Sequence, residues 1–226
     1  MSAIAENLHR VQARIQSACQ AAGRDPTSVR LLAVSKTFDA DAVRQAHAAG
    51  QTAFGENYIQ EGVDKIQALQ DLGLEWHCIG PIQSNKTRLV AAHFDWVHSV
   101  DRLKTAERLS AQRPTTLAPL QVCIQVNMDG GENKSGVVPD QALALAQAVT
   151  ALPHLQLRGI MSIPEPYEDE ALTRAVHAQA HALWLHLKSQ GLSLDTLSMG
   201  MTADLEAAVQ QGSSMVRVGT AIFGSR

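Results

Sequence analysis

Lys36 is the residue of this sequence best suited to covalent chemistry, because it ends a short, largely apolar run, 31–36, and precedes a turn into a helix. An ammonium group at the carboxyl end of a buried strand loses hydration, and burial lowers the pKa of a lysine, which frees its amine to attack carbonyl groups. A lysine that extends from a strand end into water would account for the same residue without any chemistry. The segment alone favours this second interpretation, so other residues must decide between the two.

Two short turns near the carboxyl end of the chain could bind an anion. Ser198 and Gly200 lie in the first turn, and Gly219 and Thr220 lie in the second. Backbone N–H groups and hydroxyls of small residues in adjacent turns form anion sites, and in (β/α)8 enzymes a phosphate often binds in the loops after strands seven and eight. Ordinary tight turns need the same residue types, so these four residues alone do not distinguish the two possibilities.

Arg217 precedes the second turn and is expected to point into the interior of the fold. In an extended strand it shares one face with Met215 and Gly219, while the two intervening valines share the other face and would contact helices. An inward guanidinium must find acceptors because it does not lose its charge. The acceptor could be Glu56, in an internal ion pair, or it could be a bound ligand.

One small molecule could contact all three features at once. Pyridoxal 5'-phosphate (PLP) combines an aldehyde for Lys36, a ring acceptor for Arg217 and a phosphate for the two turns, and its aldehyde forms a Schiff base with lysine. A phosphosugar aldolase would use the same lysine and the same phosphate site. These residues by themselves therefore leave both ligand classes open.

The composition excludes several classes of protein. The chain has 226 residues with a net charge of -3, and no block of lysine and arginine indicates nucleic-acid binding. No apolar run is long enough for a membrane span, and the first residues do not have the pattern of a secretory signal. The three cysteines, Cys19, Cys78 and Cys123, are odd in number and far apart, which favours reduced thiols in a cytoplasmic protein.

The elements that must position these residues alternate between strand-like and helix-like patterns, which is typical of βαβ units and a parallel sheet. Strands are predicted near 30–35, 52–56, 74–79, 96–100, 120–126, 156–162, 195–198 and 215–218. Helices are predicted near 39–49, 58–70, 84–92, 102–112, 139–151, 168–190 and 203–211, after an amphipathic N-terminal helix that ends before Gly23. Ser84 is expected to begin the helix over 84–92.

Eight strands in 226 residues predict an α/β fold with a single (β/α)8 TIM-type barrel domain over 1–226, with an open doubly wound sheet as the alternative. Too few residues follow the eighth strand to form a closing helix. The N-terminal helix is expected to fill that place in the outer ring.

The sequence resembles the pyridoxal phosphate homeostasis protein family, also described as the YggS/PROSC type. The matching segments run in family order over nearly the whole chain: 33–36 (AVSK), 54–58 (FGENY), 76–86 (WHCIGPIQSNK), 133–136 (NKSG), 198–201 (SMGM) and 215–224 (MVRVGTAIFG).

The resemblance implies a barrel like the N-terminal domain of alanine racemase, with the cofactor linked covalently to Lys36. It also implies phosphate contacts around Ser198, Gly219 and Thr220, and a position for Arg217 near the pyridine nitrogen. Asn57 matches a family position close to the cofactor, and His77 and Met161 are expected to line the barrel as further cofactor-binding residues. The resemblance further implies intracellular vitamin B6 homeostasis, with transfer of the cofactor to PLP-dependent apoenzymes as a possible extension of that role. We expect a monomer.

A non-catalytic role is also favoured by the chemistry of the residues. A guanidinium beside the pyridine nitrogen keeps that nitrogen unprotonated, so the ring is a poor electron sink for decarboxylation or transamination. Racemisation needs an acid/base group on each face of the substrate carbon, and neither Tyr58 nor Tyr167 has a spacing that marks it as the partner of Lys36. Racemases of this barrel type also carry a further β domain, whereas this chain ends at Arg226, directly after the predicted barrel. A small PLP-dependent racemase and a Schiff-base aldolase are the alternatives.

The polar loop at 129–136, which contains Lys134, could touch the cofactor as it enters or leaves. A solvated loop without such a role is the favoured interpretation.

Overall fold

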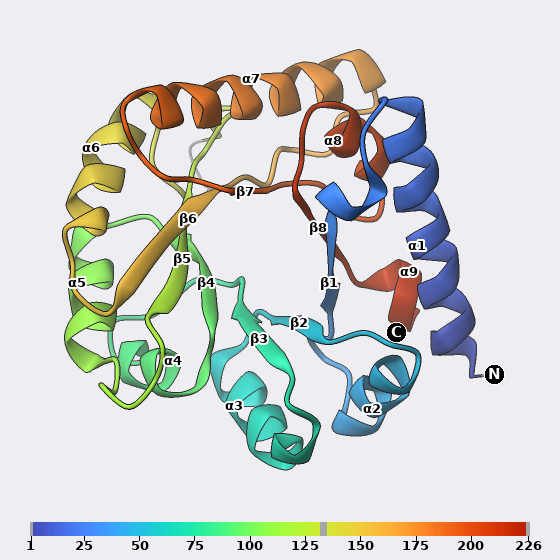
Figure 1. The fold of residues 1–226 in the computed structure, drawn as a ribbon, viewed down its shortest axis with the longest axis horizontal. Coiled ribbons are helices and arrows are strands. Elements are labelled where there is room, and N and C mark those ends of the chain that lie inside the picture. Colours follow the sequence, from blue (N-terminus) through green and yellow to red (C-terminus); the bar gives the residue numbers. More distant parts are fainter. Residues whose placement is uncertain (1, 132–134, 225–226) are drawn as a thin grey trace.

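The structure is a computed structural model that describes residues 2–131 and 135–224. Eight parallel strands, hydrogen-bonded in chain order from β1 to β8, close into a barrel (Figure 1). The strands are β1 Arg30–Val34, β2 Ala53–Glu56, β3 Glu75–Cys78, β4 Trp96–Val100, β5 Leu120–Gln125, β6 Leu155–Met161, β7 Thr196–Ser198 and β8 Met215–Val218. The predicted barrel is confirmed and the open doubly wound sheet is wrong, because β1 pairs with β8 as well as with β2.

Helices surround the barrel as an outer layer. They are α1 Ala3–Ala21, α2 Ala40–Ala48, α3 Ile59–Ala68, α4 Thr87–His93, α5 Leu103–Gln112, α6 Pro139–Thr150, α7 Glu170–Ser189, α8 Leu205–Gln210 and α9 Thr220–Phe223, with two short 3-10 turns at Pro26–Ser28 and Gln70–Leu72. The predicted helix start at Ser84 is wrong, because residues 84–86 form a turn and α4 begins at Thr87. The Thr87 hydroxyl donates to the Ser84 carbonyl oxygen at 3.1 Å, which holds this turn.

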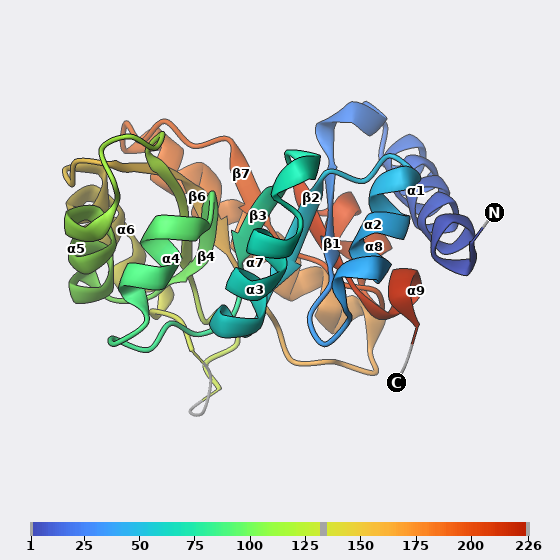
Figure 2. The same cartoon turned by 90° about the horizontal axis from the view of Figure 1, so that it is seen from below.

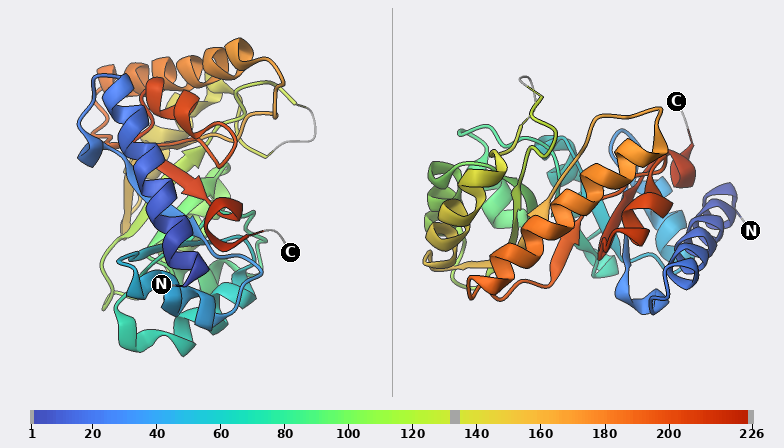
Figure 3. Two further views of the ribbon diagram at one scale, coloured as in Figure 1. Left: turned by 90° about the vertical axis from the view of Figure 1, so that its right-hand side faces the viewer. Right: turned by 90° about the horizontal axis from the view of Figure 1, so that it is seen from above.

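The N-terminal helix α1 completes the outer ring, as predicted. It packs against α2, α8 and α9 (Figure 3). The Asn7 side chain donates to the carbonyl oxygen of Ile222 at 2.9 Å, and Arg14 makes a two-pronged contact with Glu206 at 2.8 Å. The four-residue helix α9 was not predicted, because its sequence is too short to show a periodic pattern.

The strand residues divide into two sets by alternation of the side chains. One set faces the helices and joins the large apolar core, which contains Val216 and Val218 of β8. The other set fills the barrel interior with an aliphatic cluster of Leu32, Ala53 and Met215 and a second cluster of Trp96, Cys123 and Met161. Polar side chains occupy the space that these two clusters leave inside the barrel, as described below.

Two further observations concern the state of the cysteines and the character of the helices. Cys19, Cys78 and Cys123 are all free and buried. None of the helices within 2–131 and 135–224 combines the length and the apolar character that crossing a bilayer requires.

Candidate functional site

The carboxyl ends of the eight strands form one mouth of the barrel, and the predicted site residues gather there. Figure 2 shows the strands β1, β2 and β3 side by side in the barrel wall. Lys36 follows β1, Asn57 follows β2, and Gly219 and Thr220 follow β8. Pairing of Ala33 with Val218 places the end of β1 level with the turn after β8. Residues from opposite ends of the sequence therefore lie side by side, because barrel closure makes β1 and β8 neighbours.

Lys36 is exposed at this mouth, which agrees with the interpretation that its own segment favoured, a lysine that extends from the strand end into water. It lies two residues beyond the end of β1, in the turn that follows the strand, while Leu32 of the same strand lies in the interior cluster. Ser35 has the opposite orientation and points toward the helices. The amine is thus accessible to a ligand that enters from solvent.

A buried ion pair anchors the backbone beside Lys36. The Lys65 ammonium on α3 donates to Glu56 Oε1 at 2.8 Å and to the Ser35 carbonyl oxygen at 2.7 Å. The Ser35 hydroxyl donates to Glu56 Oε1 at 2.6 Å. The side chain of Lys65 is 6% exposed and that of Glu56 is fully buried. Desolvation raises the pKa of Glu56, while the charge of Lys65 opposes that shift, so each member of the pair depends on the other.

The residue after Lys36 is held in an unusual conformation. Thr37 has a φ of 68°, in the left-handed region that a β-branched residue rarely adopts. Its backbone N–H donates to Glu61 Oε1 at 2.5 Å, and the same carboxylate oxygen accepts from Lys65 at 2.7 Å. Strain of this kind persists only where the surrounding contacts over-determine the backbone. The residues on both sides of Lys36 are therefore fixed by one charged cluster.

Arg217 points into the barrel, as alternation along β8 predicted. Its Nη1 donates to Ser198 Oγ at 2.7 Å, and its Nη2 donates to the carbonyl oxygen of Ser162 at 2.9 Å. Burial lowers the pKa of Arg217 to about 10, which leaves the guanidinium charged at neutral pH. The alternative of an ion pair with Glu56 is wrong, because Glu56 binds Lys65. Both acceptors that hold Arg217 are neutral, so part of its charge is free to attract an acceptor on a ligand.

The two predicted anion-binding turns are in contact with each other. The Thr220 hydroxyl donates to Thr202 Oγ1 at 3.3 Å, and the Arg217 backbone N–H donates to the Gly200 carbonyl oxygen at 2.9 Å. At Gly219 a Cβ atom would lie 3.2 Å from the Val34 carbonyl oxygen, so a glycine permits the close approach of β8 to β1. These contacts give one continuous rim of small residues beside Lys36.

The remaining predicted residues occupy different depths. Asn57 is half-buried at the mouth, whereas Ser198, His77 and Met161 have no exposed surface. The Ser198 hydroxyl already binds Arg217 and His98, so any phosphate contact of Ser198 would have to come from its backbone. His77 and Met161 line the interior, and both remain predictions as cofactor contacts. Lys134 lies outside the described residues.

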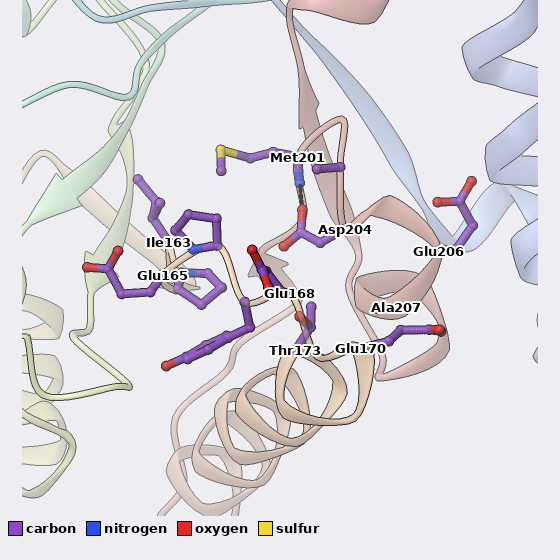
Figure 4. A pocket seen from close by; sticks show the side chains of 13 residues that line it. Ile163, Glu165, Glu168, Glu170, Thr173, Met201, Asp204, Glu206 and Ala207 are labelled. Atoms are coloured by element: carbon purple, nitrogen blue, oxygen red, sulfur yellow. Dashed lines mark hydrogen bonds between the residues drawn. The ribbon is translucent and has the colours of Figure 1, made fainter.

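A cavity of about 570 Å³ opens beside the mouth, between the loop after β6, the start of α7 and the turn before α8 (Figure 4). Its lining includes Glu165, Glu168, Glu170 and Glu206. Asp204 closes the turn by accepting from the Met201 backbone N–H at 2.7 Å. So many carboxylates disfavour a phosphate in this cavity, and neither Lys36 nor Arg217 lines it.

Sequence reasoning missed Lys65, His98 and Ser162. The Ser162 hydroxyl is buried at the end of β6 and has no hydrogen-bond partner among the described residues. His98 lies two residues after Trp96 on a predicted strand, so the two side chains share one face, and their common direction could have been inferred. Lys65 gave only a weak signal, namely a position four residues after Glu61 on a predicted helix.

Comparison with known proteins gives relatives along the whole chain. Residues 2–226 match the family model described as the alanine racemase N-terminal domain. The pyridoxal phosphate homeostasis protein of Pseudomonas aeruginosa is 60% identical over 226 residues, which cover 100% of this chain and 97% of that protein. A solved structure of PipY from Synechococcus elongatus PCC7942 with PLP bound is 39% identical with a TM-score of 0.85, covering 98% of this chain and 100% of that one. Alanine racemase from Corynebacterium glutamicum, at 20% identity, a TM-score of 0.70 and coverage of 99% of this chain and 61% of that one, shares the fold.

Proposed function

The chain belongs to the alanine racemase N-terminal domain family and, within it, to the pyridoxal phosphate homeostasis proteins, and on this basis we propose that it binds PLP reversibly as a Schiff base on Lys36. Its role is to hold the cofactor in intracellular vitamin B6 homeostasis and to pass it to PLP-dependent apoenzymes, without a reaction of its own. When bound, the cofactor supplies a reactive aldehyde, which the protein keeps out of free solution.

The observation that carries the proposal is the arrangement at the barrel mouth. An exposed lysine with fixed flanking backbone lies at the same barrel end as a buried arginine that has only neutral acceptors. In our proposal Lys36 holds the aldehyde, Arg217 donates to the ring nitrogen, and the rim around Gly219 and Thr220 holds the phosphate, with Asn57 beside the ring.

The residues present fit this cofactor on two further grounds. The buried Ser162 hydroxyl lacks a partner among the described residues, and it lies next to the carbonyl oxygen that holds Arg217, so a polar group of a ligand would satisfy it. Gly219 and Thr220 also bring the backbone of a small-residue turn and a hydroxyl to the rim, the kinds of group that bind a phosphate. His77 and Met161, which line the barrel interior beneath the mouth, remain predicted cofactor-binding residues, through direct contact or through the side chains above them.

A non-catalytic role agrees with a guanidinium at the ring nitrogen. A donor there leaves the nitrogen unprotonated and weakens the electron withdrawal on which most PLP reactions depend. We further propose that residues 1–226 form one domain, that the protein is monomeric and that it is cytoplasmic. Three buried free thiols agree with a reducing compartment.

The test is reduction of the purified protein with borohydride, followed by mapping of the modified residue. We expect a yellow protein that carries the label on Lys36, and loss of both colour and label in Lys36→Ala. Lys104→Ala is a matched control, because Lys104 is an exposed lysine on α5. A colourless wild-type protein, or a label on another lysine, would overturn the proposed site.

The role itself has a separate test. Cofactor should reach an apoenzyme faster from the loaded protein than by spontaneous release into solution. Racemisation of free amino acids by the wild-type protein, abolished in Lys36→Ala, would overturn the non-catalytic role.

A further inference from the structure

A chain of hydrogen-bonded polar side chains crosses the barrel interior from one end to the other. Glu75 Oε1 lies 2.6 Å from His77 Nε2, and His77 Nδ1 lies 2.8 Å from His98 Nε2. His98 Nδ1 lies 2.9 Å from Ser198 Oγ, which accepts from Arg217 Nη1 at 2.7 Å. Glu75 is the first residue of β3, so the chain connects the amino-terminal mouth of the barrel to the opposite, proposed cofactor mouth.

The two ends of this chain, together with the neutral state of its buried histidines, fix the direction of every hydrogen bond in it. Arginine can only donate, and an ionised carboxylate can only accept. Arg217 therefore donates to Ser198, Ser198 donates to His98 Nδ1, and His98 Nε2–H donates to His77 Nδ1. His77 Nε2–H then donates to Glu75. With one proton on each ring, both protons lie on Nε2, and no other assignment of two neutral imidazoles satisfies all four contacts.

Glu75 is ionised because of its neighbours. Burial favours the neutral acid, but the hydrogen bond from His77 and the Arg30 guanidinium lower the pKa of Glu75 to about 2. Arg30 Nη2 lies 2.8 Å from Glu75 Oε1. The acceptor at this end of the chain therefore keeps its negative charge over the whole physiological pH range.

The middle of the chain is enclosed and neutral. The rings of His77 and Trp96 stack with centroids 5.1 Å apart and planes 8° apart, and Trp96 packs with Cys123 and Met161. His77 and His98 are fully buried. Burial lowers the pKa of His77, although Glu75 opposes the shift, and burial with the nearby positive charges lowers that of His98 further. Close packing leaves the rings no alternative partners.

We propose that His98 and His77 are positioning residues for Arg217, which they orient through Ser198 as a fixed donor toward the ring nitrogen of the bound cofactor. Neither histidine touches the cofactor in this proposal, which rests on the function proposed above. Without the chain, the Ser198 hydroxyl could rotate, and its lone pairs would have no fixed direction. With the chain, its proton is directed to His98 Nδ1, which keeps a lone pair of Ser198 Oγ aimed at Arg217 Nη1.

The first test uses the ligand-free protein. Two-dimensional ¹H–¹⁵N spectra of the imidazoles should show His77 and His98 as neutral rings protonated on Nε2. A resonance pattern with the proton on Nδ1 of either ring, or a charged ring at pH 7, would overturn the proposal. This readout does not depend on cofactor binding, so it also stands if the proposed function fails.

The second test is a double-mutant cycle with Ser198→Ala and His98→Gln. Each variant should shift the visible band of the loaded protein and release cofactor about tenfold faster, the change expected when one hydrogen bond to a charged group is lost. The double variant should be no worse than Ser198→Ala, because His98 acts only through the hydroxyl. Additive effects, or an unchanged band and release rate in folded His98→Gln, would overturn the proposal.

His177→Gln is the matched control. His177 is also fully buried and lies 2.8 Å from a carboxylate oxygen of Asp204, but it belongs to α7 outside the barrel. It should leave the band and the release rate unchanged. If His98→Gln does not fold, Ser198→Ala alone tests the proposal. This variant should shift the His98 Nδ1 resonance in the ligand-free protein, because the hydroxyl that donates to Nδ1 is lost. An unshifted resonance would overturn the proposed hydrogen-bonded chain. Absence of label on Lys36 in the wild-type protein would instead refute the proposed function.

Discussion

Replacement of Lys65 by methionine should destabilise the protein by about 3–5 kcal/mol, the usual cost of breaking a buried ion pair by removing one partner. Methionine keeps the length and flexibility of the side chain, so packing is largely preserved. The ammonium, however, makes three contacts between 2.7 and 2.8 Å, to Ser35, Glu56 and Glu61. Its loss leaves the carboxylate of Glu56 fully buried with Ser35 as its remaining partner.

The variant should also respond to pH in a particular direction. Burial already raises the pKa of Glu56, and removal of Lys65 removes the charge that opposes this shift. A group whose folded-state pKa is raised favours the folded protein most at low pH, where it is protonated in both states. The loss of stability in Lys65→Met should therefore grow as pH rises above the ordinary glutamate range, and should shrink in acid.

The assay is urea unfolding followed by tryptophan fluorescence and far-ultraviolet circular dichroism. Adding Glu56→Gln to Lys65→Met should recover most of the lost stability, because no charge is then buried without a partner. Arg44→Met is the control: Arg44 and Asp71 form an exposed pair, and its loss should leave the midpoint nearly unchanged. A loss in Lys65→Met of less than about 1 kcal/mol, the range of an exposed pair, would refute the reasoning. Trapping of cofactor on Lys36 should fall as well, because the backbone of Ser35 loses its donor.

Two further predictions concern the barrel itself. Gly159→Ala should lower the free energy of unfolding by more than about 3 kcal/mol or prevent folding, because its Cβ would lie 1.6 Å from the carbonyl oxygen of Thr196 in β7. Gly55→Ala is the milder control, because its Cβ would meet only side-chain atoms that can move. Equal losses of stability in urea unfolding of the two variants would contradict the argument. Glu75 has a pKa lowered from 4.5 to about 2, so it stabilises the fold above its ordinary pKa, and this stabilisation is lost as pH falls through that interval. Glu75→Gln should lower the free energy of unfolding by about 1–2 kcal/mol at pH 7, after discounting for partial exposure, and the decrease in stability with falling pH should become shallower. An unchanged pH dependence in acid would count against the lowered pKa of Glu75.

The fold could be predicted because its signals are local. Eight short apolar runs with turn residues between them are enough to indicate a barrel, and alternation along one strand correctly directed Arg217 inward. The exposure of Lys36 was favoured by its segment but could not be settled there, since the exposure of a side chain just beyond a strand depends on the loops around it. Alternation gives the direction of a side chain but says nothing about what lies above it.

The polar contacts could not be predicted, because they join residues that are distant in sequence. Ser198 and His98 are 100 residues apart, and their contact depends on how β4 and β7 face each other across the closed barrel. Lys65 looks like an ordinary surface lysine on a helix until Glu56, at the end of β2, is placed beneath it. Only the three-dimensional packing of strands and helices identifies such partners.

The position of α1 has a consequence for synthesis. Synthesis makes α1 before its partners α8 and α9, and the contact between Asn7 and Ile222 spans 215 residues. Until α8 and α9 are made, the apolar stripe of α1, with Leu8, Val11 and Ile15, has only part of its final partner surface available. Closure of the ring therefore has to wait for these two helices, and the apolar face of α1 is partly uncovered until then.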